Sequence, residues 1–201
     1  MKGKYYILIA GVGGQGNILA SRVLATAAII EGYSVRIGET YGASQRGGSV
    51  VSHVKIGKDV FSPLIPKGYA DVILGLEPLE ALRIAYNFGN PDTVIISNVK
   101  PVPSGIPLDS YPNVDSILKE LSSLSHKVYV VNATEQVIKT VGTARALNIF
   151  MLGCLCGLEV IPLTQKSFEE AIRSVVPPKY VDLNIKAFRE GVEAIRKLAM
   201  R

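Results

Sequence analysis

The pattern of apolar and polar positions predicts alternating strands and helices along the chain. Tyr5–Ala10 is an uninterrupted apolar run, as expected of a strand covered on both faces, and Asn17–Ile30 is rich in alanine, leucine and isoleucine at helical spacing. Further strands are expected at Tyr33–Ile37, Ser49–Ile56, Ala70–Leu76, Asp92–Ser97 and Lys127–Asn132. Further helices are expected at Leu79–Phe88, Ser116–Leu124, Ala133–Val141, Ala144–Leu158, Ser167–Val175 and Val181–Met200. This order predicts an α/β fold: a three-layer, Rossmann-like, mostly parallel sheet with a helical C-terminal end.

A hairpin is expected to interrupt this alternation. Ser49–Ile56 alternates as a strand, Gly57–Asp59 has the composition of a turn, and Val60–Leu64 is expected to return as a second strand. We therefore expect an antiparallel hairpin inserted into the parallel sheet. The length of 201 residues, without an internal repeat, predicts that residues 1–201 form a single domain.

Glycines mark the turn between the first strand and the first helix. Gly11, Gly13 and Gly16 fit the pattern G-x-G-x-x-G, and Gly14 is a further glycine beside Gln15. Without a Cβ, such positions permit a tight turn or the close approach of a ligand, and the following helix N-terminus directs N–H groups toward an anion. The turn is therefore a candidate site for a phosphate-bearing ligand or for a loop of a partner. The alternative is a purely structural turn.

The stretch Gly38–Ser52 is rich in small and polar residues. A dinucleotide-binding fold would place a ribose-binding acid near the end of the second strand, where Glu39 stands. Further along, Arg46 is followed by Gly47 and Gly48. A loop of this kind can fold backbone N–H groups around a ligand, while the arginine supplies a fork for a phosphate or carboxylate. The alternative is a long surface loop with a solvated arginine.

Composition and charge narrow the class of function. Apolar residues make up 48% of the chain and charged residues 19%, which indicates a globular protein with enough apolar surface for a permanent partner. Lys and Arg outnumber Asp and Glu by 22 to 17, but the basic residues are scattered and aromatic residues are only 7%, which argues against binding of nucleic acid. No apolar run is long enough to span a membrane, and the N-terminal stretch lacks the pattern of a signal peptide. A cytoplasmic location, away from the membrane, is expected.

The cysteines and histidines do not suggest a metal site. Cys154 and Cys156 lie two positions apart in an apolar helical segment, where their side chains do not face each other, so we interpret them as small core residues. Two cysteines cannot hold a four-thiolate iron–sulfur cluster. His53 and His126 are isolated from other potential ligands, and no metal-binding residue is predicted.

Five segments together resemble a known family. They are Gly11–Gly16 (GVGGQG), Glu39–Ser52 (ETYGASQRGGSVVS), Ser62–Pro66 (SPLIP), Glu77–Arg83 (EPLEALR) and Arg145–Gly153 (RALNIFMLG). In this order, over nearly the whole chain, they are similar to the gamma subunit or domain of the 2-oxoacid:ferredoxin oxidoreductases, above all the small beta subunit of indolepyruvate ferredoxin oxidoreductase. The resemblance implies a complex that decarboxylates an aryl 2-oxoacid on thiamine diphosphate, passes electrons through iron–sulfur clusters to ferredoxin and releases an acyl-CoA.

The resemblance also implies how this chemistry is divided between chains. Thiamine diphosphate, magnesium and the clusters need sequence motifs that are not recognisable here, so a larger partner subunit is expected to bind them. The family's domain lies over the thiamine site and helps to receive coenzyme A. Together with the glycines named above, the motif match gives these candidate cofactor-binding residues: Gly11, Gly13, Gly14, Gln15, Gly16, Ser44, Gln45, Arg46, Gly47, Gly48, Asn132 and Thr134. No catalytic residue is expected in this chain.

Two other functions stay open at this point. A stand-alone NAD-dependent oxidoreductase would use Gly11–Gly16 and Glu39, although no Ser/Tyr/Lys set and no suitably placed histidine supports one. A purely structural subunit would dock a partner's backbone on the glycine turn and bind no small molecule. On the preferred interpretation, the isolated chain has no oxidoreductase activity and self-associates through the apolar surface that its partner would cover.

Overall fold

Strand β1 (Lys4–Val12) lies inside the sheet because its residues are apolar on both faces. In the computed structural model, which describes residues 3–41, 48–103 and 110–200, residues 7–12 of β1 are all buried. Side chains of a strand alternate between the two faces, so an apolar run without alternation requires cover on both sides. The predicted first strand is confirmed.

The remaining elements follow the predicted alternation. The other strands are β2 (Ser34–Tyr41), β3 (Ser49–Gly57), β4 (Val72–Gly75), β5 (Val94–Asn98) and β6 (Lys127–Val131). The helices are α1 (Asn17–Ile30), α2 (Pro78–Phe88), α3 (Val114–Leu124), α4 (Ala133–Val141), α5 (Leu147–Gly157), α6 (Gln165–Val175) and α7 (Val181–Ala199). Short 3-10 turns precede α5 and α7, at η2 (Ala144–Ala146) and η3 (Pro178–Tyr180).

One antiparallel strand interrupts an otherwise parallel sheet. Among the described residues, six strands lie in the order β2-β3-β1-β4-β5-β6. Strands β1, β4, β5 and β6 are parallel, whereas β3 runs antiparallel to both β1 and β2. Strand β3 therefore separates β1 from β2, which a dinucleotide-binding fold places side by side. The predicted mostly parallel α/β sheet with an antiparallel insertion is confirmed, but β3 pairs with β2 and not with the predicted return strand.

The expected return strand Val60–Leu64 is wrong. Residues 58–71 contain no strand. Instead, Val60 and Ile65 are buried, and the backbone N–H of Ile65 donates to Nδ1 of His53 on β3 at 3.2 Å. The apolar residues of this stretch therefore anchor a loop on the sheet and do not pair with a neighbouring strand.

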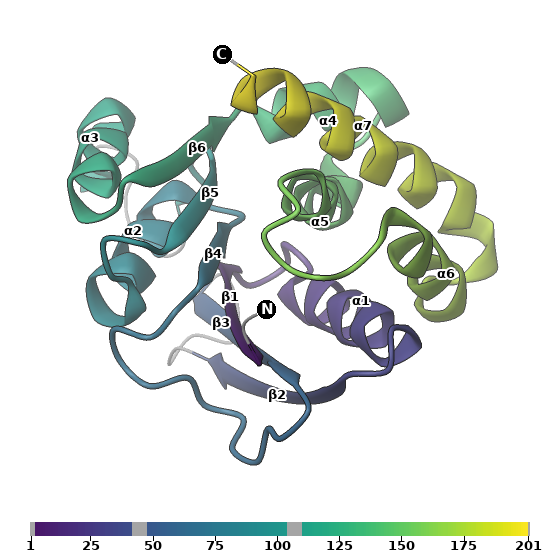
Figure 1. Ribbon diagram of the computed structural model, residues 1–201. Helices are drawn as coiled ribbons and strands as arrows, with labels where there is room; N and C mark the ends of the chain where they lie inside the picture. Colours follow the sequence, from purple (N-terminus) through teal and green to yellow (C-terminus); the bar gives the residue numbers. More distant parts are fainter. Residues whose placement is uncertain (1–2, 42–47, 104–109, 201) are drawn as a thin grey trace.

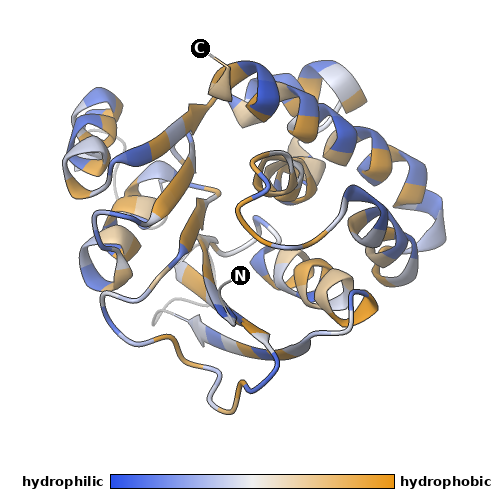
Figure 2. Cartoon of the chain, viewed as in Figure 1, coloured by the Kyte–Doolittle hydropathy of each residue, from blue (hydrophilic) through white to orange (hydrophobic). Residues whose placement is uncertain are grey.

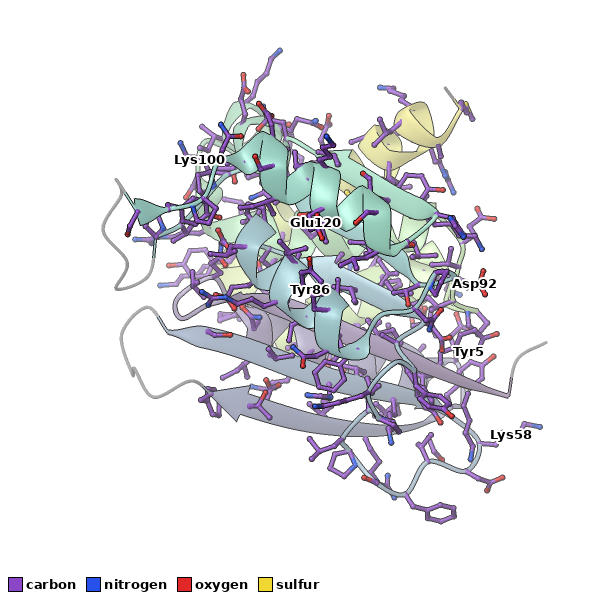
Figure 3. The ribbon with its side chains drawn as sticks, turned by 90° about the vertical axis from the view of Figure 1, so that its left-hand side faces the viewer. Tyr5, Lys58, Tyr86, Asp92, Lys100 and Glu120 are labelled. Atoms are coloured by element: carbon purple, nitrogen blue, oxygen red, sulfur yellow. The ribbon has the colours of Figure 1, made fainter. Side chains whose placement is uncertain are left out.

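Helices cover both faces of the sheet (Figure 1). Helices α2 and α3 cover one face, and α1, α4, α5, α6 and α7 lie on the other, each group with its own buried core. The hydroxyl of Tyr86 on α2 donates to the carboxylate of Glu120 on α3, and Figure 3 shows these two residues on the outer side of that helix pair. The predicted three-layer arrangement is confirmed.

Helix α5 is the buried centre of the larger helical layer. Ten of its residues, 147–156, are buried, and Figure 2 shows it largely in hydrophobic colours, while α6 and α7 alternate between hydrophobic and hydrophilic. Helix α7 crosses α5 at two facing glycines: a Cβ on Gly153 would collide with the carbonyl of Phe188, and one on Gly191 with the carbonyl of Phe150. The two backbones therefore approach each other more closely than side chains would allow.

The carboxyl ends of the parallel strands form one edge of the sheet. Figure 3 shows Tyr5 of β1 and Asp92, which precedes β5, on one side of the sheet, and Lys100, which follows β5, on the opposite side. In open α/β sheets, ligands bind outside the carboxyl ends of the strands.

Of the helices in the described ranges, none combines the length and apolar character that crossing a membrane requires.

Candidate functional site

The glycine turn after β1 has a backbone that side chains would prevent. Gly14 and Gly16 have φ of +96° and +83°, a conformation that L residues rarely adopt. A Cβ on Gly16 would also collide with Asn148 of α5, whose side-chain amide donates to the Gly16 carbonyl at 3.0 Å. A Cβ on Gly11 would stand 2.7 Å from Oε1 of Gln15. The glycine pattern therefore allows a tight turn packed against α5.

Gln15 fills the space between the ends of β1 and β4. Its Oε1 accepts a hydrogen bond from the backbone N–H of Val12 at 2.8 Å, and its Nε2 donates to the carbonyl of Leu76 at 3.1 Å. Helices α1 and α2 leave these two strands toward opposite faces, so this is the switch point at which α/β sheets bind ligands. Because Gln15 occupies the inner part of this crevice, a ligand at the turn has to lie outside it.

A second amide extends this network along the carboxyl edge. Asn98, the buried last residue of β5, donates to the Leu76 carbonyl at 3.2 Å and to Oγ1 of Thr134 at 2.9 Å. The Leu76 carbonyl thus joins the glycine turn to the start of α4, where the candidate Thr134 lies. Asn98 was not among the predicted residues, although an amide directly after the predicted strand Asp92–Ser97 is the signal that could identify it.

Asn132 lies at the same edge but outside this network. Its side-chain amide donates to the carboxylate of Glu135 and does not cap α4. Asn132 lines a surface pocket at the carboxyl end of β6, together with Gln136 and Lys197. The structure therefore places Thr134 in contact with the network of the glycine turn and Asn132 beyond it.

The small-residue loop returns to the glycine turn. Ser44, Gln45, Arg46 and Gly47 fall in residues 42–47, which lie outside the described residues. Gly48, the next residue, accepts a hydrogen bond at its carbonyl from the N–H of Gly13 at 2.9 Å. Asn17, the first residue of α1, donates its side-chain amide to the carbonyl of Val50 at 3.1 Å. Two predicted parts of the site therefore meet within hydrogen-bonding distance at the sheet edge.

The start of α1 suits an anion. Gly16 is the N-cap residue, so no side chain caps the helix, and no acidic residue lies in its first turn. The first backbone N–H groups of a helix have no partner within the helix and carry partial positive charge. A phosphate group is the ligand that this combination of glycines and N–H groups favours.

Glu39 is engaged within the protein. Its carboxylate oxygens accept hydrogen bonds from the hydroxyls of Ser21 on α1 and Ser52 on β3, at 2.8 Å and 2.5 Å. Because β3 lies between β1 and β2, the strand that carries Glu39 is two strand spacings, about 10 Å, from β1. This geometry does not support the ribose contact that an NAD-dependent enzyme would need.

A buried acid that was not predicted follows β4. Glu77 is only 1% exposed, accepts the hydroxyl of Tyr111, and caps α2 by accepting the N–H of Glu80 at 2.8 Å. Burial raises the pKa of Glu77 above its ordinary value, against the opposing effect of these hydrogen bonds. In the EPLEALR segment, Glu77 therefore starts α2 and holds the chain that follows β5.

The cysteines belong to the core, as predicted. Cys154 and Cys156 are free thiols buried in α5, and burial raises the pKa of Cys156 to about 11, so its reactive thiolate is scarce at neutral pH. Burial also lowers the pKa of His53. Within residues 3–41, 48–103 and 110–200, no three His, Cys, Asp or Glu side chains are grouped so that they could hold a metal ion.

Comparison with known proteins accounts for this arrangement. The model of the pyruvate ferredoxin/flavodoxin oxidoreductase family matches residues 6–194, which include β1, the glycine turn and most of α7. The chain belongs to this family. This family member is 44% identical over 188 residues to the indolepyruvate oxidoreductase subunit IorB of Archaeoglobus fulgidus, a match that covers 92% of each chain.

Solved structures of this family share its fold. The gamma subunit of a keto/oxoacid ferredoxin oxidoreductase from Geobacter sulfurreducens is 27% identical with a TM-score of 0.70, covering 95% of this chain and 98% of that one. The 2-oxoglutarate:ferredoxin oxidoreductase of Magnetococcus marinus, solved with 2-oxoglutarate, coenzyme A and succinyl-CoA bound, is 20% identical with a TM-score of 0.72. That match covers 98% of this chain and 32% of the longer one.

These relatives confirm the family resemblance seen in the sequence. They are subunits of 2-oxoacid:ferredoxin oxidoreductases, and the present chain is a subunit of an oxidoreductase of this type. Since the relatives are parts of multi-subunit enzymes, a further subunit is implied.

Proposed function

We propose that this chain is the small subunit of a thiamine-diphosphate-dependent oxidoreductase that acts on indolepyruvate or a similar aryl pyruvate. The 2-oxoacid loses CO2, its acyl group passes to the thiol of coenzyme A, and two electrons pass to ferredoxin with release of one proton. The larger subunit holds thiamine diphosphate, magnesium and the iron–sulfur clusters, and this chain, a single gamma-type domain, covers that active site. Similarity to IorB over most of both chains supports this substrate class.

The hydrogen bond between Gly13 and Gly48 carries the coenzyme A part of the proposal. It joins the glycine turn and the uncapped start of α1 to the chain that leaves the loop containing Arg46. Coenzyme A carries a diphosphate and a 3′-phosphate, so backbone N–H groups and an arginine offer complementary contacts. Coenzyme A in the structure of the Magnetococcus relative is consistent with this assignment.

The other residues of the edge shape this site. Gln15 fills the crevice behind the glycine turn, so a ligand lies on the solvent side of the turn. Thr134 and Asn132 lie further along the same edge of the sheet. No proton transfer or bond-making step is assigned to a side chain of this chain. A cytoplasmic location of the protein remains a prediction.

The test is the substitution Arg46→Ala in the enzyme reconstituted from both subunits. Loss of a charge-assisted contact costs about 1.5–3 kcal/mol, so the KM for coenzyme A should rise at least about tenfold. Arg46→Lys should recover only part of this, because an ammonium group cannot reproduce the two-pronged contact of a guanidinium. The KM is measured by ferredoxin or dye reduction at varied coenzyme A, with assembly and iron content checked in parallel.

The matched control is Arg173→Ala, which removes an exposed arginine from α6. It should change the KM for coenzyme A by less than about threefold, as surface substitutions generally do. An Arg46→Ala enzyme that behaves like this control would remove Arg46 from the site. If, in addition, coenzyme A did not protect the loop that contains Arg46 in the assembled enzyme, the chain would be a structural subunit. Binding of NAD by the isolated chain would instead support a stand-alone oxidoreductase.

A further inference from the structure

An apolar surface runs along α1 and the edge strand β2, from the candidate site at the start of α1 to the opposite end of the helix. Its members are exposed in this chain, although isoleucine and tyrosine side chains of this size are mostly covered in soluble proteins. We define the α1–β2 surface by six residues: Ile18, Arg22, Ile29, Ile30, Ile37 and Tyr41. Figure 2 shows hydrophobic colouring along α1 as far as its C-terminal end, on the outside of the molecule.

The topology makes this surface continuous. Strands β1 and β2 run in the same direction, and helix α1 connects them, so α1 runs antiparallel to β2. The hydrogen bond from the Ser21 hydroxyl to the Glu39 carboxylate holds α1 and β2 side by side. One turn before Ser21 lies Ile18, and two residues beyond Glu39 lies Tyr41, so both extend from this bond in the same direction. Toward the other end, Ile29 lies near the start of β2.

The strand beside this surface also has a free edge. Within the described residues, β2 pairs only with β3 and forms one end of the sheet. Exposed edge strands with apolar side chains are sites of association unless charged residues or prolines block them. On the face of β2 that looks toward α1, Ile37 is 36% exposed and Tyr41 62% exposed, and the exposed Arg36 of this strand lies on the other face. The apolar side chains beside the free edge are therefore accessible to a partner.

The charge available on the surface is positive. Arg22 lies between Ile18 and Ile29 on the outer side of α1, and it forms no ion pair with any described residue. The neighbouring carboxylates are already engaged: Glu39 by two serine hydroxyls, and Glu31 by the N–H and hydroxyl of Thr164. A second copy of this chain would bring another uncompensated arginine, whereas a partner with carboxylates among apolar residues would complement it.

We infer that the α1–β2 surface is where this chain docks on the larger subunit, against an apolar patch that carries at least one carboxylate for Arg22. This inference rests on the proposed function, since it takes the larger subunit as the partner. The surface also adjoins the proposed site, because Tyr41 is the residue directly before the loop that carries Arg46. Docking here would hold Tyr41, at one end of that loop, against the partner, while Gly48 at the other end is held by the hydrogen bond from Gly13.

The test compares Ile29→Glu with Ile138→Glu in binding to the purified larger subunit. Ile29 is 61% exposed on α1, and Ile138 is 47% exposed on α4, a helix that Figure 1 shows at the top of the molecule, away from β2. Ile29→Glu should weaken binding at least about tenfold, because it places a charge in an apolar contact and repels the partner's carboxylate. Ile138→Glu should change the Kd by less than about threefold.

Charge variants test the sign of the partner. Arg22→Glu should weaken binding at least about tenfold, and Ile29→Lys should weaken it less than Ile29→Glu does. Circular dichroism of each isolated variant establishes that the fold is intact, and Arg22, being exposed, provides a variant that does not disturb the core.

The outcomes separate this inference from the proposed function. If the wild-type chain binds the larger subunit but Ile29→Glu and Arg22→Glu bind as tightly as Ile138→Glu, the docking surface lies elsewhere and the proposed function stands. If Ile29→Lys is the more damaging of the two charged variants, the partner is not acidic and the inference is wrong. Loss of self-association in Ile29→Glu, measured by light scattering, with unchanged binding to the larger subunit would assign the surface to a second copy. Failure of the wild-type chain to bind any larger subunit would overturn the proposed function itself.

Discussion

The side-chain amide of Gln15 donates to the carbonyl of Leu76 at 3.1 Å and so joins the glycine turn to the end of β4. The same carbonyl accepts the amide of Asn98, which in turn contacts Thr134. The Leu76 carbonyl thus links the glycine turn, the end of β5 and the start of α4 at the carboxyl edge of the sheet. The shape of the candidate site therefore depends on side chains that need not touch a ligand.

Gln15→Ala should therefore destabilise the protein. The substitution removes a donor to Leu76 and an acceptor for the N–H of Val12, so we expect the free energy of unfolding to fall by about 1–3 kcal/mol. Urea denaturation provides the measurement. The control is Asn87→Ala, which removes an amide that donates to the Arg83 carbonyl on the exposed side of α2 and should cost less than about 0.5 kcal/mol. Equal losses in both variants would show that the hydrogen bonds of Gln15 stabilise the protein no more than an exposed one does.

The crossing of α5 and α7 should not tolerate a methyl group at its glycines. In Gly191→Ala, the new Cβ collides with the carbonyl of Phe150, a backbone atom that cannot move without shifting α5. Overpacking of this kind costs about 1–3 kcal/mol, which thermal denaturation detects as a lower Tm. Gly3→Ala is the control, because nothing lies within 4 Å of the added atom. An unchanged Tm for Gly191→Ala would mean that the two helices can separate at no cost.

His53 should make stability fall as the pH is lowered. Burial, and to a lesser extent the charge of Lys55, holds the pKa of His53 below its ordinary value of 6.5. Between that folded pKa and 6.5 the unfolded chain binds more protons, so the stabilisation present above 6.5 is lost as the pH falls through this window, by at most about 1.4 kcal/mol per pH unit. The difference in unfolding free energy between wild type and His53→Gln, measured across this range, should shrink at lower pH. A constant difference would contradict the buried neutral imidazole.

Glu77 should make stability fall as the pH is raised, the opposite of the effect of His53. Burial raises its pKa above 4.5, so between 4.5 and the raised pKa the folded protein binds more protons than the unfolded chain. Stability from this group is therefore greatest at the acidic side of the window and is lost as the pH rises. The advantage of wild type over Glu77→Gln, measured by urea denaturation, should fall with rising pH. An advantage that grows with pH would show that hydrogen bonding to Tyr111 outweighs burial.

The sequence predicted those parts of the fold that depend on local pattern. The apolar run at Tyr5–Ala10 and the glycines after it are determined by nearby residues, and both lie where they were expected. The stretch Val60–Leu64 misled because buried residues at Val60 and Ile65 can anchor a loop as well as a strand. The contact that decides between them, from Ile65 to His53, joins residues 12 positions apart.

The candidate site was predicted in its parts but not in its connections. The meeting of Gly13 with Gly48 depends on β3 pairing with β1, which no local pattern shows. Asn98 was not predicted for a similar reason, since its partners are distant in the sequence: Leu76 follows β4 and Thr134 lies in α4. Arg46 lies outside the described residues, and its role stays a prediction.

The position of β3 also governs the order in which the sheet can assemble during synthesis. Strand β1 leaves the ribosome before the other strands of this sheet, yet its neighbours on both sides, β3 and β4, begin only at Ser49 and Val72. Because β3 lies between β2 and β1 in the sheet, β2 cannot pair with β1 before β3 has been synthesised. A nascent chain that ends before Gly57 therefore carries an apolar strand without a partner, a form of exposure that chaperones bind and that leads to aggregation in their absence.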